Sequence, residues 1–207
     1  MKLMKKIYKA TKIFKYKLYR FYGSLKNKYI LLGNEIDNGS IRIIGTPIIN
    51  TNKGGKIKIG NNLCMNNGLI ANQIGYNTPC ILRAEGGSII VGDNVGMSQT
   101  TLIAKGADIT IGNNVKLGGG VKVYTTDFHC LDYMKRRDAK SDVAERLCLP
   151  VLIGDDCFVG AGVIILKGVT IGDRSIIGAG SVVTKNIPAD CIAAGNPCRV
   201  IKEIARQ

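Results

Sequence analysis

The sequence predicts an all-β solenoid, a three-sided parallel β-helix of six-residue repeats, with a basic amphipathic helix before it and a short helix after it. Three observations predict this fold. An aliphatic residue recurs at every sixth position near the carboxyl end, glycine accounts for 26 of the 207 residues, and ten of the 29 basic residues fall in the first 28 positions. The expected boundaries are a helix over 1–29, a β-helix over 30–198 and a helical tail over 199–207.

The N-terminal segment combines basic charge with an apolar helical stripe. Residues 1–28 contain ten lysines and arginines and no acid, and the stripe consists of Leu3, Ile7, Ala10, Phe14, Leu18, Phe21 and Leu25. Two interpretations stay open. In one, the helix lies on an anionic membrane surface; in the other, it caps the first coil of the solenoid. The two are compatible if only the first two turns of the helix are free of the solenoid. The remaining chain has 19 basic against 15 acidic residues, so we expect no nucleic-acid partner.

The six-residue period is clearest after residue 150. The repeating aliphatic positions are Ile153, Val159, Ile165, Ile171, Ile177 and Val183. Neither a helix nor an alternating strand has this period. In a triangular solenoid, each hexapeptide forms one side and turns one corner, so that three of them close a coil of 18 and the aliphatic side chains stack inside. Glycine, asparagine and aspartate suit the corners because they tolerate a positive φ.

Two interruptions of the period predict loops. Hexapeptide repeats of the same kind also occur at 57–68, 89–100 and 109–120. Ile111 and Ile153 are 42 residues apart, which is one coil of 18 residues plus 24 further residues. We therefore expect residues 127–150 to be ejected from one corner, and a second irregularity near residues 71–88. Loops of this length in a compact domain are usually functional or disordered.

The cysteines and the apolar runs indicate the cellular environment. The seven cysteines form no C-x-x-C pair, and no secretory signal precedes them, so we expect a reducing cytoplasm, neither a disulfide framework nor a metal site, and no spanning helix. If the basic segment binds lipid, the expected location becomes peripheral, at the inner face of the membrane.

The carboxy-terminal stretch, IGDDCFVGAGVIILKGVTIGDRSIIGAGSVVTKNIPADCIAAGNPCRVIKEI, resembles the maltose, galactoside and xenobiotic O-acetyltransferases among the bacterial hexapeptide-repeat transferases. The resemblance covers roughly residues 30–204, and the ending GAGSVVTKNIP…AAGNPCRVIKEI is its narrowest part. It implies a left-handed β-helix, acetyl-CoA as co-substrate with no metal, and a homotrimer with active sites between subunits.

His129 is the only histidine, and it stands at the start of the ejected loop in TTDFHC. An imidazole, with an ordinary pKa of about 6.5, suits a general base that takes the proton of an acceptor hydroxyl, and the resemblance implies a catalytic histidine here. A surface histidine is the alternative. Asp127 and Asp132 are candidates to orient the ring and, with Gly120, to contact the acceptor, and the alternative for either aspartate is a solvated loop charge. The similar enzymes usually have asparagine at the position of Gly120.

For the acetyl-CoA donor, the resemblance implies contacts along the outside of the carboxy-terminal coils. The residues that match the family pattern are Ala161, Ala179, Thr184, Lys185, Arg199 and Lys202. Small side chains would let pantetheine approach the backbone, and the last two cations suit the nucleotide phosphates. The alternative for the two alanines is a purely structural role at corners.

The resemblance, together with His129 as the base, implies an acetyl-CoA-dependent O-acetyltransferase acting on a hydroxyl of a sugar or a surface-polysaccharide precursor. The expected partners are therefore a small-molecule or glycan acceptor and further copies of the chain. Other acceptors within the class stay open: serine, an antibiotic or a nucleotide sugar. From a different class, a non-catalytic β-solenoid scaffold or a membrane-associated binding module also stays open. A zinc enzyme of the γ-type carbonic anhydrase kind is disfavoured, because its metal site would need three histidines and the chain has one.

Overall fold

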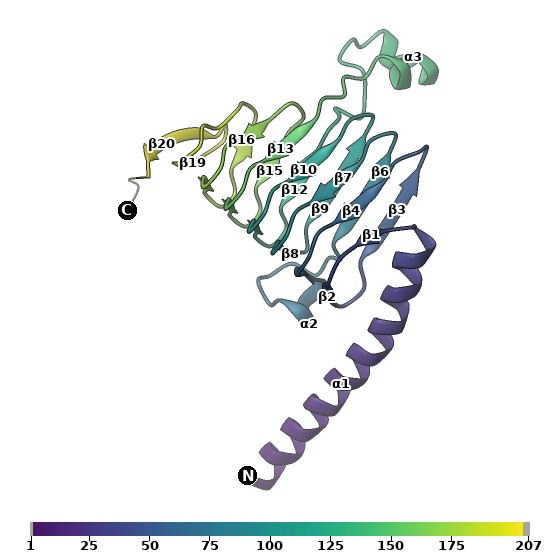
Figure 1. Ribbon diagram of the computed structural model, residues 1–207, viewed down its shortest axis with the longest axis vertical. Coiled ribbons are helices and arrows are strands. Elements are labelled where there is room, and N and C mark those ends of the chain that lie inside the picture. Colours follow the sequence, from purple (N-terminus) through teal and green to yellow (C-terminus); the bar gives the residue numbers. More distant parts are fainter. Residues whose placement is uncertain (1, 205–207) are drawn as a thin grey trace.

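The computed structural model, which describes residues 2–204, is a left-handed parallel β-helix with a long helix projecting from its first coil (Figure 1). Each side of the triangular prism is one sheet. Sheet A contains β1 (Asp37–Asn38), β4 (Ile57–Ile59), β7 (Ile89–Val91), β10 (Ile109–Ile111), β13 (Val151–Ile153) and β16 (Thr170–Ile171). Sheet B contains β2 (Ile41–Ile44), β5 (Leu63–Asn66), β8 (Gly96–Ser98), β11 (Lys116–Leu117), β14 (Phe158–Val159), β17 (Ile176–Ile177), β19 (Cys191–Ala194) and β20 (Arg199–Glu203). Sheet C contains β3 (Ile48–Asn52), β6 (Ile81–Glu85), β9 (Thr101–Lys105), β12 (Lys122–Tyr124), β15 (Ile164–Ile165) and β18 (Val182–Val183).

The core consists of columns of aliphatic side chains that run along the prism axis. The parallel register pairs each inward position with its equivalent one coil later; in sheet C the column is Leu82, Leu102, Val123, Ile165 and Val183. All six repeat positions predicted from Ile153 to Val183 are fully buried, so the expected inward orientation is confirmed. One coil alone could not bury these side chains, and stacking provides the burial.

A ladder of polar side chains follows the corner between sheets A and B. Asn62, Asn94, Asn114 and Asp156 all have φ close to +60°. Their side chains are linked in series, with each asparagine amide donating to the side-chain oxygen one coil further on at 2.9–3.1 Å. Asparagine and aspartate tolerate this backbone conformation, which confirms the expected corner chemistry.

The ejected loop leaves sheet C after Tyr124 and rejoins sheet A at Val151. Leu149 N donates to Thr125 O at 2.9 Å, and Thr126 and Cys148 form an isolated bridge, so the two ends of the loop meet at the corner. The loop contains the 3-10 turn η1 (Lys135–Arg137) and the helix α3 (Ala139–Ala144).

The second irregularity lies earlier than expected. The extra residues are 67–80, between sheets B and C, and they include the short helix α2 (Gly68–Ala71). Residues 71–80 of the expected segment 71–88 belong to this insertion, whereas residues 81–85 form the regular strand β6, where the coil has already resumed. The spacing of the repeats determines how many residues are extra but not the corner at which they leave.

Both ends of the β-helix differ from the expected boundaries. The N-terminal helix α1 spans Lys2–Gly33, four residues beyond the expected end. The helix expected over 199–207 is wrong for its first five residues, which form β20, antiparallel to β19. An open sheet edge exposes unpaired N–H and C=O groups, and β20 pairs with those of β19. Residues 205–207 lie outside the described part. Among the helices of residues 2–204, none combines the length and the hydropathy that a membrane-spanning helix requires.

A buried carboxylate lies between sheets C and A in the first coils. Glu85 is 7% exposed and lies 2.9 Å from Lys53 Nζ, 2.7 Å from Arg83 Nη2 and 3.7 Å from Lys105 Nζ. The Lys53 ammonium, together with Lys105 and Arg83, holds the pKa of this carboxyl below its usual value and outweighs the opposing effect of burial. The carboxylate thus joins three successive coils at one corner.

The two adjacent isoleucines of β7 provide a matched test of the core. Ile89 is fully buried and Ile90 is 40% exposed. We expect Ile89→Ala to lower the free energy of unfolding by about 2–5 kcal/mol through a cavity, and Ile90→Ala by about 1 kcal/mol or less. Urea denaturation of both variants measures the difference, and equal losses would contradict the inward assignment.

Glu85 provides a test with pH. Because the pKa of Glu85 is lowered on folding, its stabilisation is present above about pH 4.5 and is lost as the pH falls through the folded-state value. We expect Glu85→Gln to lower the free energy of unfolding by about 1–3 kcal/mol at pH 7. The difference in the free energy of unfolding between Glu85→Gln and the unsubstituted protein should decrease to near zero in acid. A difference that stays constant with pH would show that the charge of Glu85 is not its origin.

Candidate functional site

His129 is held by a carboxylate within the ejected loop. Its Nδ1 lies 2.7 Å from Asp142 Oδ2. The carboxylate is 13% exposed, whereas the histidine side chain is 67% exposed. An ionised carboxylate at Nδ1 retains the proton there and leaves the lone pair on Nε2, the nitrogen available to a substrate.

Asp142 is held in turn by the local fold of the loop. It lies in the first turn of α3, whose N-cap Asp138 accepts from Ser141 N at 2.9 Å. Its Oδ1 accepts from Cys130 N at 2.7 Å. The hydrogen bond to His129, followed by that from Cys130, holds the pKa of Asp142 below its usual value. The carboxylate is therefore ionised at neutral pH and joins the start of the loop to its helix.

Neither aspartate expected to orient His129 does so. Asp127 forms an ion pair with Lys167 at 2.7 Å on the neighbouring coil. Asp132 accepts from Met134 N at 2.8 Å and thereby shapes the turn before η1. The expectation is wrong because both side chains are used by the nearest backbone and coil. The partner, Asp142, is 13 residues from His129, and no motif spacing indicates it.

Gly120, an expected acceptor contact, lies at the corner between sheets B and C under the ring of Tyr76. Its φ is +73°, and a Cβ placed there would lie 2.8 Å from the Tyr76 Cζ. The same ring faces Gly162, one coil further on, where a Cβ would lie 3.0 Å from the hydroxyl. We call this surface, formed by Gly119, Gly120 and Gly162, the glycine corner. Its glycines leave room for Tyr76, a residue that no sequence motif indicates.

Gln99 fixes the loop that carries Tyr76. Its side chain is 2% exposed, and its amide nitrogen lies within hydrogen-bonding distance of the carbonyls of Gly68, Asn72 and Tyr76 at 2.9–3.2 Å. One buried amide therefore anchors segment 67–80 at three points. The Tyr76 ring is held over the glycine corner as a consequence.

Three of the expected donor contacts share the edge that continues from the glycine corner. Ala161 and Ala179 occupy equivalent corner positions one coil apart, joined by a hydrogen bond from Gly180 N to Ala161 O of 2.8 Å. Arg199 pairs in register with Ala194, at the end of β19 next to this corner. Lys202 pairs with Ile192, further along β20. The half-buried Ala161 and the exposed Ala179 thus lie along an edge next to β20, which carries the exposed cations Arg199 and Lys202.

Thr184 and Lys185 lie at a different corner. They follow β18, at the side of sheet C from which the ejected loop also leaves, and both are exposed. Sheet C separates them from Ala161, Ala179 and the glycine corner. Gly120 precedes β12 and His129 follows it, so these two residues also lie at opposite borders of sheet C. One chain therefore presents the expected site residues at two corners.

The cysteines and acids form no additional cluster in the described chain. All seven cysteines are free thiols, and within residues 2–204 no three His, Cys, Asp or Glu side chains are placed to hold a metal ion. Burial raises the pKa of the Cys80 thiol to about 12. This thiol is therefore protonated at neutral pH.

Comparison with known proteins agrees with the repeat pattern. Residues 150–185 match the family model described as bacterial transferase hexapeptide, six repeats. The chain is 39% identical over 126 residues to galactoside O-acetyltransferase from Escherichia coli, a match covering 61% of this chain and 59% of that protein. It is 46% identical over 115 residues to nodulation protein L from Rhizobium leguminosarum, covering 56% and 57%. The chain thus spans less than two thirds of the length of these relatives.

A solved structure shows the same fold over most of the chain. A mutant of AntD, an N-acyltransferase from Bacillus cereus, in complex with dTDP-4-amino-4,6-dideoxyglucose and coenzyme A, aligns with a TM-score of 0.67 and 20% identity, over 86% of this chain and 89% of that one. The repeat match, the curated relatives and the three-sided solenoid agree with one another. The chain is a hexapeptide-repeat protein, and it is similar to acetyltransferases that contain this repeat.

Proposed function

We propose that the chain is an acetyl-CoA-dependent O-acetyltransferase whose acceptor is a hydroxyl of a sugar or a sugar-containing molecule. The observation that carries the proposal is the His129–Asp142 pair. It combines an exposed imidazole with a partly buried carboxylate at 2.7 Å, and its placement on the ejected loop leaves Nε2 accessible to another molecule. Similarity to a galactoside O-acetyltransferase supports the class of acceptor.

In this reaction His129 Nε2 takes the proton of the acceptor hydroxyl as the oxygen attacks the thioester carbonyl carbon. The Asp142 carboxylate stabilises the imidazolium that forms. When the carbon–sulfur bond breaks, the proton passes from Nε2 to the departing thiolate. The products are the acetyl ester and coenzyme A with a free thiol, and His129 returns to its neutral state.

The donor is proposed to lie along the outside of the last coils. Ala161 and Ala179 offer a strip with little side-chain bulk, and Arg199 and Lys202 supply positive charge beyond it, where phosphates would lie. Thr184 and Lys185 would contact a donor that reaches the other border of sheet C. A related fold that holds coenzyme A, in AntD, supports this class of ligand.

A trimer is proposed to bring the two corners together. Within one chain, the width of sheet C lies between His129 and the glycine corner. A neighbouring copy would present its glycine corner and Tyr76 to this loop, which forms the inter-subunit site that the family resemblance implies. Light scattering on the purified protein tests this arrangement, and a monomer would contradict it.

Removal of the base is the first test of catalysis. We expect His129→Ala to lower kcat by about 100- to 10,000-fold because the proton transfer is lost. Asp142→Asn should lower kcat by about 10- to 100-fold because the imidazole loses its orientation and charge partner. Steady-state acetylation of a series of sugar acceptors, with Lys140→Gln as a control at an exposed position of the same loop, provides the measurement. Full activity of His129→Ala would remove the basis of the proposal.

Removal of a cation is the test of donor binding. We expect calorimetric titration to show saturable acetyl-CoA binding that Arg199→Ala weakens by about tenfold, through loss of a charge-assisted hydrogen bond. Arg42→Ala, at the opposite end of sheet B, should bind like the unsubstituted protein. If the folded protein binds no acetyl-CoA, the scaffold alternative gains support; if both variants bind alike, the donor lies elsewhere.

A further inference from the structure

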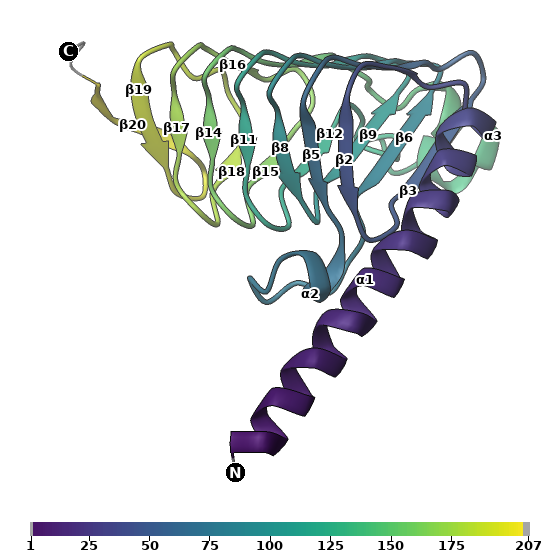
Figure 2. The same cartoon turned by 60° about the horizontal axis from the view of Figure 1, so that its bottom comes forward.

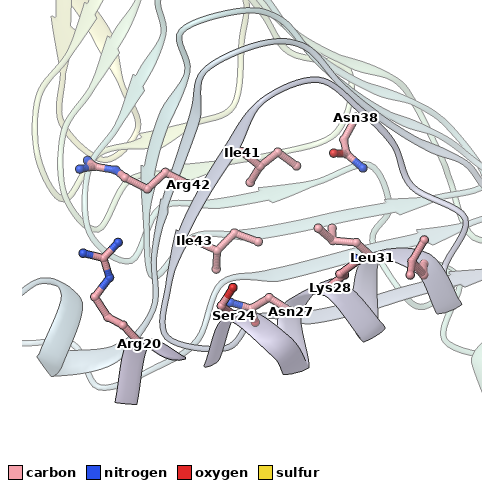
Figure 3. A pocket seen from close by; sticks show the side chains of 10 residues that line it. Arg20, Ser24, Asn27, Lys28, Leu31, Asn38, Ile41, Arg42 and Ile43 are labelled. Carbon is pink, nitrogen blue, oxygen red and sulfur yellow. The ribbon is translucent and has the colours of Figure 1, made fainter. Parts of the chain in front are cut away.

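Helix α1 contacts the solenoid through only part of its length and only one side. Asn27 is 5% exposed and its amide donates to Gly45 O at 2.9 Å, and Ile30 and Leu31 pack against the core beside Ile41 and Ile43. Figure 3 shows Asn27 and Leu31 on the side of α1 that faces these two isoleucines of β2. The last turns of α1 therefore cap the first coil.

The apolar stripe of α1 faces away from these contacts. At about 100° per residue, seven side chains fall within an arc of about 60°: Leu3, Ile7, Phe14, Leu18, Phe21, Leu25 and Leu32. We call them the outer stripe. Asn27 lies about 150° round the helix from its centre. Each member of the outer stripe is 45–69% exposed. A helix whose only task is capping would turn its apolar stripe towards the core.

The first two thirds of α1 extend away from the solenoid (Figures 1 and 2). From Lys2 to Tyr22 every residue is exposed except Tyr16, which is half-buried. The outer stripe thus forms a continuous apolar surface on a projecting helix. An apolar surface of this kind is typical of an interaction site.

The basic charge of α1 indicates which kind of partner fits the outer stripe. Residues 1–28 contain ten basic and no acidic side chains. On the helical projection, Lys15 and Lys26 border one side of the outer stripe, and Lys6 and Lys17 border the other. Packing of two copies through this stripe would bring these lysines together without an acid in the segment to pair with them. An anionic lipid surface instead accepts both the apolar stripe and its cationic borders.

We propose that the outer stripe of α1 lies on an anionic phospholipid surface and holds the β-helix at the membrane. Apolar side chains enter the interface between headgroups and acyl chains, and the bordering lysines extend to the lipid phosphates. The solenoid-facing side stays engaged with the first coil, so binding does not require α1 to detach. This proposal is independent of the acetyl-transfer chemistry.

Two isoleucines of α1 provide a matched test. Ile7 belongs to the outer stripe and is 50% exposed. Ile13 is 57% exposed and lies outside the stripe, between Arg20 and Lys6 on the helical projection. The same substitution, Ile→Ser, leaves the charge unchanged at both positions. In co-sedimentation of the full chain with vesicles of phosphatidylcholine and phosphatidylserine, we expect Ile7→Ser to bind about tenfold more weakly and Ile13→Ser to bind within about twofold of the unsubstituted protein.

Lipid composition, salt and molecular mass distinguish binding to anionic lipid from self-association of the helix. Vesicles of phosphatidylcholine alone should bind weakly, and added salt should weaken binding to the anionic vesicles. The proposal is overturned if the unsubstituted protein ignores the anionic vesicles, or if both variants bind equally. It is also overturned if light scattering shows that Ile7→Ser, and not Ile13→Ser, reduces the mass of an assembly that does not bind vesicles. Circular dichroism and the Tm of both variants should match those of the unsubstituted protein.

Discussion

The register between successive coils is the constraint on which the rest of the structure depends. Every inward aliphatic side chain stacks on its equivalent one coil away, and the same offset aligns the backbone hydrogen bonds and the asparagine ladder. A residue added within a side would break all three at once. Extra residues therefore leave the prism at corners, and both long insertions do so. The histidine, its carboxylate and Tyr76 are all carried by these insertions.

The features fixed by this period could be predicted from the sequence. The six buried positions from Ile153 to Val183, the corner asparagines and the location of the ejected loop all follow from counting residues. The position of His129 at the start of that loop follows in the same way. Each depends on local spacing, which a single sequence contains.

The remaining features depend on contacts between distant segments. Asp142 reaches His129 because η1 and α3 fold the loop back on itself, and the sequence between them has no repeat to reveal this. Gln99 holds segment 67–80 from a neighbouring coil, 23 to 31 residues away along the chain. The last strand pairs with β19 because an open sheet edge is available, although the ending resembles a helix in composition. The stripe on α1 was visible in the sequence, whereas the side facing the solenoid required the structure.

The closure of the ejected loop has an evolutionary consequence. The hydrogen bond from Leu149 N to Thr125 O joins the two ends of the loop at the point where the next coil begins. The length of the excursion is therefore uncoupled from the repeat that builds the prism. Longer, shorter or wholly different excursions can be exchanged at this corner without altering a core side chain. A single scaffold can in this way acquire new specificities by replacing one cassette of about two dozen residues.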